Sequence, residues 1–205
     1  MRAVRPPAGL IVIGAVGNRD AELRPGWPSR RLTRNREFEN GVDLDIFYYW
    51  KDFVSDVNEG RIGTLGAETD KLTELQARLP RKVWTFATPK GMKGKLKVIG
   101  SMWITDERPA NFVPKWRHNL FYDAASPRSV FFANSGSPEK IEEVSSYLNN
   151  RFNQAFRSNF QGEKGLHAME ADVVRGFEKL VRDYETVQFL EGIKEVLGSR
   201  SASLR

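Results

Sequence analysis

Apolar residues recur every three or four positions in four stretches of the chain, which is the spacing of an amphipathic helix. The third stretch is the best delimited, because Ser137 supplies an N-cap and Pro138 has the backbone angle of a first helical position. The predicted helices cover residues 44–57, 69–79, 138–158 and 173–198.

Elsewhere the apolar residues alternate or form short runs bounded by turn residues, which predicts strands. The predicted strands cover residues 10–13, 83–87, 96–104 and 129–133. The glycines and the proline of residues 89–94 join the second and third of these into a long hairpin. The irregular stretch 108–127 is longer than most connections, and connections of that length are usually functional loops.

These elements predict an α+β fold. The N-terminal strand, the hairpin and the strand at 129–133 build a small twisted, partly closed, barrel-like sheet, and the helices that begin at Pro138 pack on it. We therefore expect residues 1–135 to form a β-rich core with a basic N-terminal segment. Residues 136–205 are expected to form a helical C-terminal region that packs on the same core.

The amino-acid composition limits the kinds of site that this chain can form. The 205 residues are 40% hydrophobic and 28% charged, values typical of a globular domain. The chain has no cysteine, which excludes disulfides, thiolate metal sites and cysteine nucleophiles, and a reducing cytoplasmic location is the expectation. No segment is apolar over the length needed to span a membrane. With His118 and His167 as the only histidines, we predict neither a metal site nor a cofactor.

The net charge of +6 is concentrated in two segments. Residues 1–36 hold eight arginines and two acidic residues, and residues 81–105 hold six basic residues and no acidic one. Such clustering favours a polyanionic partner. The alternative is that the central lysines line the solvated face of a hairpin, where they discourage strand-to-strand aggregation. The expected phosphate contacts are Lys90, Lys93 and Lys95, with Arg31 or Arg34.

Aromatic residues are concentrated around the lysine-rich hairpin. Flat side chains beside cations are what a site needs to stack a base while its phosphates are held. The alternative for any one of them, Trp84 for example, is that it fills the core. His118 follows the sequence Lys115-Trp116-Arg117 and is either a ligand contact or an ordinary hydrogen-bonded histidine. The stacking and contact candidates are Tyr49, Trp50, Trp84, Trp103, Trp116 and His118.

The order of these motifs resembles the small β-barrels of the PUA-like superfamily, with the EVE and ASCH types nearest. The resemblance runs over about residues 40–135 and is carried by the aromatic segment 48–50, by 81–86, by the turn of glycines and lysines, and by 96–104. It implies a compact barrel whose cleft accepts RNA or an unusual or modified base. It also implies stacking aromatics near Tyr49, Trp50, Trp84 and Trp103.

The function we expect is nucleic-acid binding, including the reading of one flipped or modified base in an aromatic cleft. A rival is an enzyme that acts on a nucleotide or a phosphorylated small molecule. It would use the loops at Gly14 and Ser135 as anion cradles and His118 or Asp123 as acid-base groups. A third interpretation is a protein partner bound by the C-terminal helices. The sequence holds no enzyme signature that decides among them.

Overall fold

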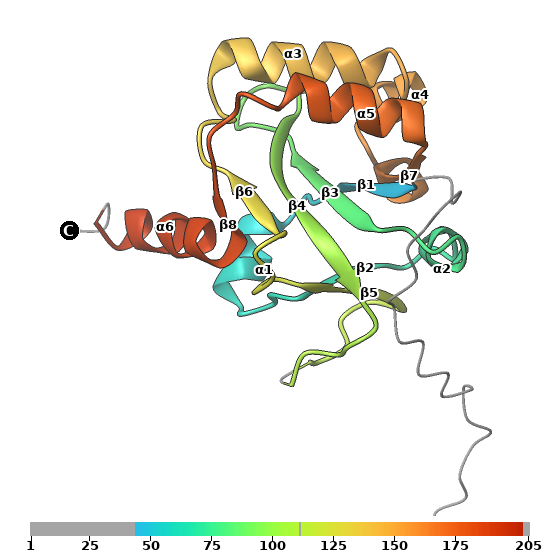
Figure 1. The fold of residues 1–205 in the computed structure, drawn as a ribbon, viewed down its shortest axis with the longest axis vertical. Helices are drawn as coiled ribbons and strands as arrows, with labels where there is room; N and C mark the ends of the chain where they lie inside the picture. Colours follow the sequence, from blue (N-terminus) through green and yellow to red (C-terminus); the bar gives the residue numbers. More distant parts are fainter. Residues whose placement is uncertain (1–43, 111, 203–205) are drawn as a thin grey trace, which may run out of the picture. The chain divides into compact units, whose positions relative to one another are not determined.

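The computed structural model describes residues 44–110 and 112–202 (Figure 1). The predicted strand at 10–13, the Gly14 loop and the candidate residues Arg31 and Arg34 lie outside the described residues. Within the described part, eight strands join one mixed sheet that curls into a half-barrel, in the order β2-β5-β4-β3-β1-β7, with β6 paired to β4 and β8 paired to β6. The strands are β1 (Asp45–Tyr49), β2 (Thr64–Ala67), β3 (Lys82–Ala87), β4 (Lys97–Thr105), β5 (His118–Asp123), β6 (Val130–Phe132), β7 (Leu166–Met169) and β8 (Thr186–Gln188).

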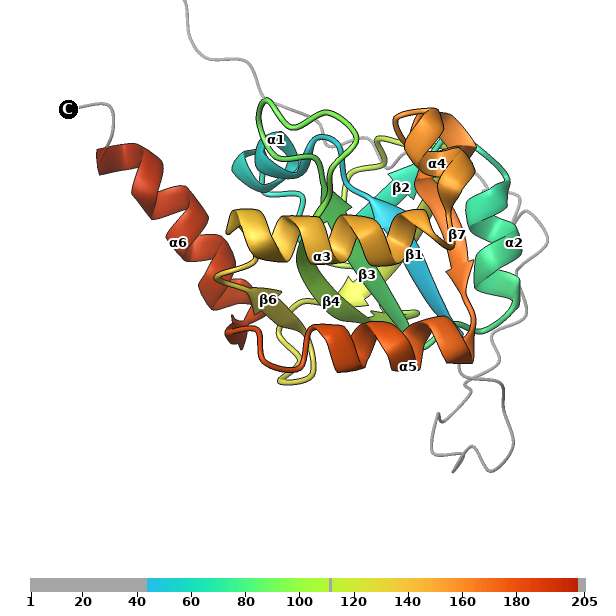
Figure 2. The ribbon, with the colours of Figure 1, turned by 90° about the horizontal axis from the view of Figure 1, so that it is seen from above.

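Two short helices of the described part separate the first three strands, and the other helices follow β6. The helices are α1 (Phe53–Asn58), α2 (Lys71–Ala77), α3 (Pro138–Asn149), α4 (Asn153–Arg157), the 3-10 turn η1 (Gly162–Gly165), α5 (Ala171–Leu180) and α6 (Phe189–Ala202). Figures 1 and 2 show α3 and α5 side by side over one face of the sheet, while α6 runs away from the sheet toward the C-terminus. The predicted α+β class and curled sheet are confirmed.

The hairpin and the start of α3 are formed as predicted. β3 and β4 pair antiparallel, with an irregularity in the register between Thr85 and Phe86. Ser137 caps α3 by accepting a hydrogen bond from the Lys140 amide at 3.4 Å. The helix predicted at 69–79 is α2, and the strand predicted at 129–133 is β6. These elements have local signals, namely turn residues, a cap and a proline stop, that do not depend on distant partners.

The helix predicted over 44–57 is wrong in its first half, where the chain forms β1. Ile46 and Tyr48 belong to the hydrophobic core on one face of the sheet, and Phe47 belongs to the core on the other face. Because both faces of β1 are buried, its residues are apolar without alternation, and such a run is easily mistaken for a buried helix. β1 pairs parallel with β3 and antiparallel with β7.

Four short strands were not predicted. β2 and β5 pair with each other, and β5 occupies part of the stretch predicted to be irregular. β7 and β8 interrupt regions predicted to be a loop and a long helix. The predicted helix over 138–158 is also divided, into α3 and α4, at the pair Asn149-Asn150, where helix propensity is low. Since β7 and β8 follow residue 135, the C-terminal region contributes strands as well as helices to the sheet.

The sheet has a separate hydrophobic core on each face. One contains Trp50, Val57, Leu65 and Phe189, and α1, α2 and α6 contribute to it. The other contains Phe47 and Trp84 and is covered by α3, α4 and α5. The parallel strands β1 and β3 lie between the two cores, so their carboxyl ends, at Tyr49 and Ala87, emerge at the same edge of the sheet. That edge is where ligand sites of parallel strands usually form.

Candidate functional site

A cavity of about 1280 Å³ opens where β1 ends, and we call it the aromatic groove. One wall comes from β2 and the start of α2, and the other comes from the segment 159–166. Segments nearly a hundred residues apart thus face each other. Its lining includes the aromatic residues Tyr49, Trp116 and Phe160, the glycine Gly66, and the charged residues Lys51, Lys71, Glu68, Asp70, Glu74 and Glu163.

Tyr49 and Phe160 form a stacked pair in this groove. Their ring centroids are 4.7 Å apart and their planes differ by 25°. Tyr49 is half-buried, and its hydroxyl donates to Thr88 Oγ1 at 3.1 Å, so the ring is held in one orientation. Gly165 makes the approach feasible, because a Cβ there would meet the Phe160 carbonyl oxygen at 2.8 Å and the Tyr49 Cβ at 3.2 Å.

The backbone beside this pair is strained. Asn159 and Phe160 have φ angles of 57° and 59°, in the left-handed region, and Gly162 follows with 56°. Two consecutive residues with side chains in that region are costly, by about 1 to 3 kcal/mol each, and such strain collects at ligand-binding walls. Packing compensates for it here: Phe160 is 3% exposed and also contacts Phe156 at a centroid distance of 4.8 Å.

Trp116 forms the opposite side of the groove and depends on a glycine. A Cβ at Gly66 would lie 2.4 Å from the Trp116 Cε3, so the indole occupies the space that any side chain at position 66 would fill. Lys115 Nζ lies 4.9 Å from the centre of the indole ring. Trp116 is half-buried and keeps part of its surface for a ligand. The structure therefore brings together two predicted stacking residues, Tyr49 and Trp116, that are 67 positions apart in the sequence.

The groove has an acidic rim. Glu68, Asp70, Glu74 and Glu163 line it, against two cations, Lys51 and Lys71. Lys71 Nζ donates to the Glu163 carbonyl oxygen at 3.0 Å, and burial lowers the pKa of Lys71. This distribution disfavours phosphate groups inside the groove, while aromatic rings remain available to a neutral or cationic base.

A second cavity, of about 810 Å³, lies at the carboxyl end of β3, and we call it the lysine hollow. Lys51, Lys90 and Lys97 line it together with Asp52 and Glu195. Lys51 lines both cavities, so the aromatic groove and the lysine hollow adjoin at the segment that follows β1.

The predicted lysine cluster is divided by the structure. Lys90 lines the hollow, and Lys93 is exposed outside it. Lys95 forms an ion pair with Glu142 of α3. Lys97 was not selected from the sequence, yet it is the lysine of this segment that is half-buried in the hollow.

Trp50 and Trp84 are buried, so the prediction that they stack a base as partly exposed rings is wrong. Trp50 is 2% exposed, and its Nε1 donates to Asp56 Oδ2 at 2.9 Å. Trp84 is 3% exposed, and its Nε1 donates to Asp45 Oδ2 at 2.8 Å. Each indole satisfies a buried carboxylate, which is a structural role. Burial raises the pKa of Asp45, although Trp84 and the cations Arg81 and Lys82 counteract that shift.

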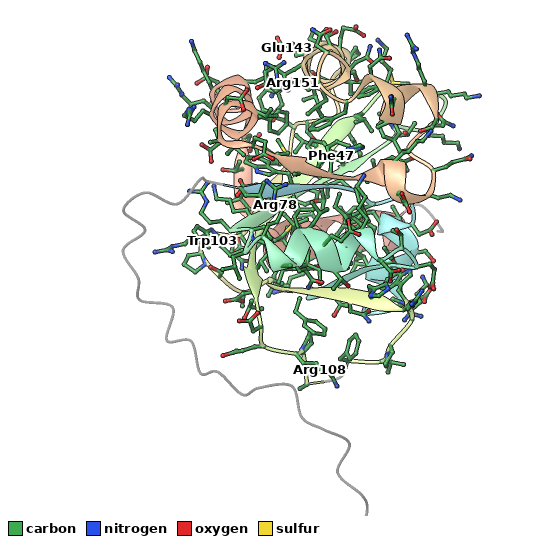
Figure 3. All side chains as sticks on the ribbon, turned by 90° about the vertical axis from the view of Figure 1, so that its right-hand side faces the viewer. Phe47, Arg78, Trp103, Arg108, Glu143 and Arg151 are labelled. Atoms are coloured by element: carbon green, nitrogen blue, oxygen red, sulfur yellow. The ribbon has the colours of Figure 1, made fainter. Side chains whose placement is uncertain are left out.

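Trp103 is half-buried but lies at the other end of the sheet. It pairs in register with Lys82, the first residue of β3, whereas Tyr49 pairs with Phe86 near the end of that strand. Four residues along a strand are about 13 Å. The Arg128 guanidinium lies 4.8 Å from the Trp103 ring centre, and Lys82 Nζ lies 5.9 Å from it. Figure 3 shows Trp103 at the edge of the molecule and Phe47 inside it.

His118 has contacts at both ring nitrogens. Nδ1 lies 2.9 Å from Thr73 Oγ1, and Nε2 lies 2.8 Å from Asp70 Oδ1. Both partners belong to the segment that begins α2, so the ring fastens that helix to β5. The buried Nε2 atom lies within ion-pair distance of Asp70 but has no hydrogen-bond partner within the described residues. Asp123, the other acid-base candidate, accepts from the amides of Ala125 and Ser126, both at 3.0 Å, and shapes a turn.

Lys51, Lys97 and Phe160 belong to the two cavities and were missed from the sequence. Lys51 directly follows the aromatic run 47–50. Had that run been predicted as a strand, Lys51 would have been recognised as the residue at its carboxyl end. Lys97 alternates with Lys93 and Lys95, so only tertiary contacts distinguish it. Phe160 lies in a loop, and nothing in its local sequence indicates a left-handed backbone.

Within the described residues, no group of three or more histidine, aspartate or glutamate side chains is placed to hold a metal ion. In the same part of the chain, every helix is too short or too polar to cross a membrane. Comparison with known proteins adds no assignment, since no family model, no curated protein and no solved structure matches the chain significantly.

Proposed function

We propose that this protein binds single-stranded nucleic acid and holds one base in the aromatic groove against Tyr49 and Trp116. The observation that carries the proposal is the groove itself: two half-buried aromatic side chains from distant segments line one cavity, and a strained wall at Asn159 and Phe160 shapes it. Base stacking on aromatic side chains is worth about 1 to 3 kcal/mol per base and tolerates different sequences.

The charges around the groove favour one orientation of the strand. The acidic rim of Glu68, Asp70, Glu74 and Glu163 repels phosphates, so a base enters while the backbone stays outside. The acid-free segment 81–105 supplies positive charge beside the groove, since Lys90 lines the adjoining hollow. A duplex would have to present a flipped base to reach the same rings.

The modified-base preference implied by the PUA-like resemblance belongs to this proposal. The rim supports it in one respect, because a base that carries a positive charge would gain from both the carboxylates and the aromatic faces. The aromatic side chains also stack neutral bases, so unmodified single strands are the first ligands to test.

The test is the affinity of the protein for a fluorescent single-stranded oligonucleotide, measured by anisotropy with and without a modified base at its centre. Tyr49→Ala and Trp116→Ala should each weaken binding by about 5- to 150-fold, the equivalent of about 1 to 3 kcal/mol. Trp103→Ala is the matched control, because Trp103 is also half-buried but lies at the other end of the sheet.

Unfolding free energies of the same variants separate lost stacking from lost folding. The proposal fails if the parent protein binds no oligonucleotide, or if Tyr49→Ala and Trp116→Ala bind as tightly as Trp103→Ala when all three are folded.

A further inference from the structure

We infer that the lysine hollow is a phosphate-binding subsite in which Lys51, Lys90 and Lys97 hold a phosphate group next to the base in the aromatic groove. The identification of this phosphate as part of a nucleotide unit rests on the proposed function. The assignment of the hollow to a phosphate group rests on the hollow alone.

Three lysines converge on the lysine hollow. The three lysines come from different places in the chain: Lys51 follows β1, Lys90 lies in the turn after β3, and Lys97 begins β4. Folding brings them to one cavity of about 810 Å³. Like charges repel one another, so a shared cavity with three ammonium groups is more stable when an anion occupies it.

Lys97 lines the hollow from the first position of β4. This side chain is half-buried, and its amino group has no hydrogen bond or ion pair within residues 44–110 and 112–202. Burial lowers the pKa of Lys97. Its neighbour Lys95 pairs with Glu142, and Lys82 of β3 pairs with Glu178 at 2.9 Å. A cation kept away from water without a carboxylate partner gains from a ligand that supplies the negative charge.

The remaining lining is compatible with an anion. Asp52 and Glu195 offset part of the lysine charge but leave the hollow with an excess of one cation. Gly136, just before the N-cap of α3, also borders it, and a Cβ there would meet nothing within 4 Å. The hollow therefore has open space beside the positive end of a helix, which adds to the field of the lysines.

The lysine hollow adjoins the aromatic groove. Lys51 lines both cavities, and the Tyr49 hydroxyl donates to Thr88, a residue of the hollow. A ligand with its base on Tyr49 thus has its neighbouring phosphate within reach of Lys51. The ligand class is a nucleotide unit whose phosphate is either a terminal monoester or an internal diester of the strand.

The experiment measures binding of inorganic phosphate, adenosine, adenosine 5′-monophosphate and a dinucleoside monophosphate to the parent, Lys97→Met and Lys90→Met. Lys93→Met is the control, because Lys93 belongs to the same turn but lies outside the hollow. We expect Lys97→Met and Lys90→Met to weaken phosphate-containing ligands about tenfold and to leave adenosine unchanged, as a lost charge-assisted contact predicts. Lys93→Met should bind all four ligands like the parent.

The melting temperature of Lys97→Met should equal or exceed that of the parent, because the variant removes an unpaired half-buried cation. If the monoester loses more affinity than the diester in Lys97→Met, the source is a terminal phosphate, and the opposite order identifies the backbone. The inference is overturned if inorganic phosphate and the monophosphate bind Lys97→Met and Lys90→Met as they bind the parent, or if Lys93→Met weakens them equally. Adenosine binding by Tyr49→Ala tests the proposed function only. Its outcome does not depend on whether the lysine variants lose affinity for phosphate.

Discussion

The ring of Phe160 lies on the ring of Tyr49 at a centroid distance of 4.7 Å, and Phe160 reaches that position from a left-handed backbone. A bulky residue with φ of 59° is held there only because tertiary packing exceeds the local strain. The pair joins β1, which lies between β3 and β7 in the sheet, to the loop before η1. The wall of the aromatic groove is consequently a product of the complete fold.

The Gly66→Ala variant should weaken oligonucleotide binding to about the same extent as Trp116→Ala, while the protein stays folded. The new methyl group would lie 2.4 Å from the Trp116 ring and 2.8 Å from its Cβ, so the half-buried indole has to be displaced. Anisotropy measures the affinity, and indole fluorescence reports the altered exposure. Gly198→Ala is the control, since a Cβ there has open space. Unchanged affinity in Gly66→Ala would show that the position of Trp116 is irrelevant to binding.

Replacement of Asn159 tests the strain in the groove wall. Asn159→Gly removes the left-handed penalty and should keep or raise the unfolding free energy, by up to about 1 kcal/mol, whereas Asn159→Val should lower it by about 1 to 2 kcal/mol. Urea denaturation of both variants measures the difference. Equal unfolding free energies for the glycine and valine variants would mean that the backbone relaxes at this position without cost.

Trp84→Phe should lower the unfolding free energy by about 2 to 4 kcal/mol, because it removes buried volume and leaves Asp45 Oδ2 without its indole donor. Trp103→Phe is the comparison. Trp103 is half-buried, and its indole forms no hydrogen bond within the described residues, so the expected loss is below about 1 kcal/mol. Chemical denaturation measures the unfolding free energies of both variants. Similar decreases in the two variants would contradict the structural role of the Trp84–Asp45 pair.

His167 should make stability fall on acidification. Burial, together with the charge of Lys71, lowers the pKa of His167 from its ordinary value near 6.5. The unfolded chain therefore binds a proton at higher pH than the folded protein, so stability is fully present above about pH 6.5 and is lost as pH falls through the folded pKa. Unfolding free energies at pH 8 and pH 5 should differ more in the parent than in His167→Gln. Identical pH dependence in the two proteins would exclude this contribution.

Local sequence signals determined several elements before any tertiary contact was known. The hairpin of β3 and β4 follows from alternation around a turn of glycines and a proline, and the start of α3 follows from Ser137 and Pro138. These features are specified by residues close together in the chain. The same holds for the α+β class.

Tertiary contacts determine that β1 and the short strands are strands. The residues of β1 read as a helix because both sides of the strand are buried, and its identity depends on pairing with β3 and β7. β2, β5, β7 and β8 have three to six residues each, and partners distant in sequence stabilise them. Local propensity in so short a segment is too weak to specify a strand.

In the candidate site, too, the sequence indicated some features and only the tertiary structure determined others. The sequence alone indicated the composition of the site, aromatic side chains beside lysines, and it placed Tyr49 and Trp116 among the candidates. It could not separate them from Trp50 and Trp84, because local sequence does not determine whether an aromatic side chain lies in the core or in a groove. Burial, like the encounter of Lys51, Lys90 and Lys97 in one hollow, depends on which distant segments pack together, and only the complete fold determines that.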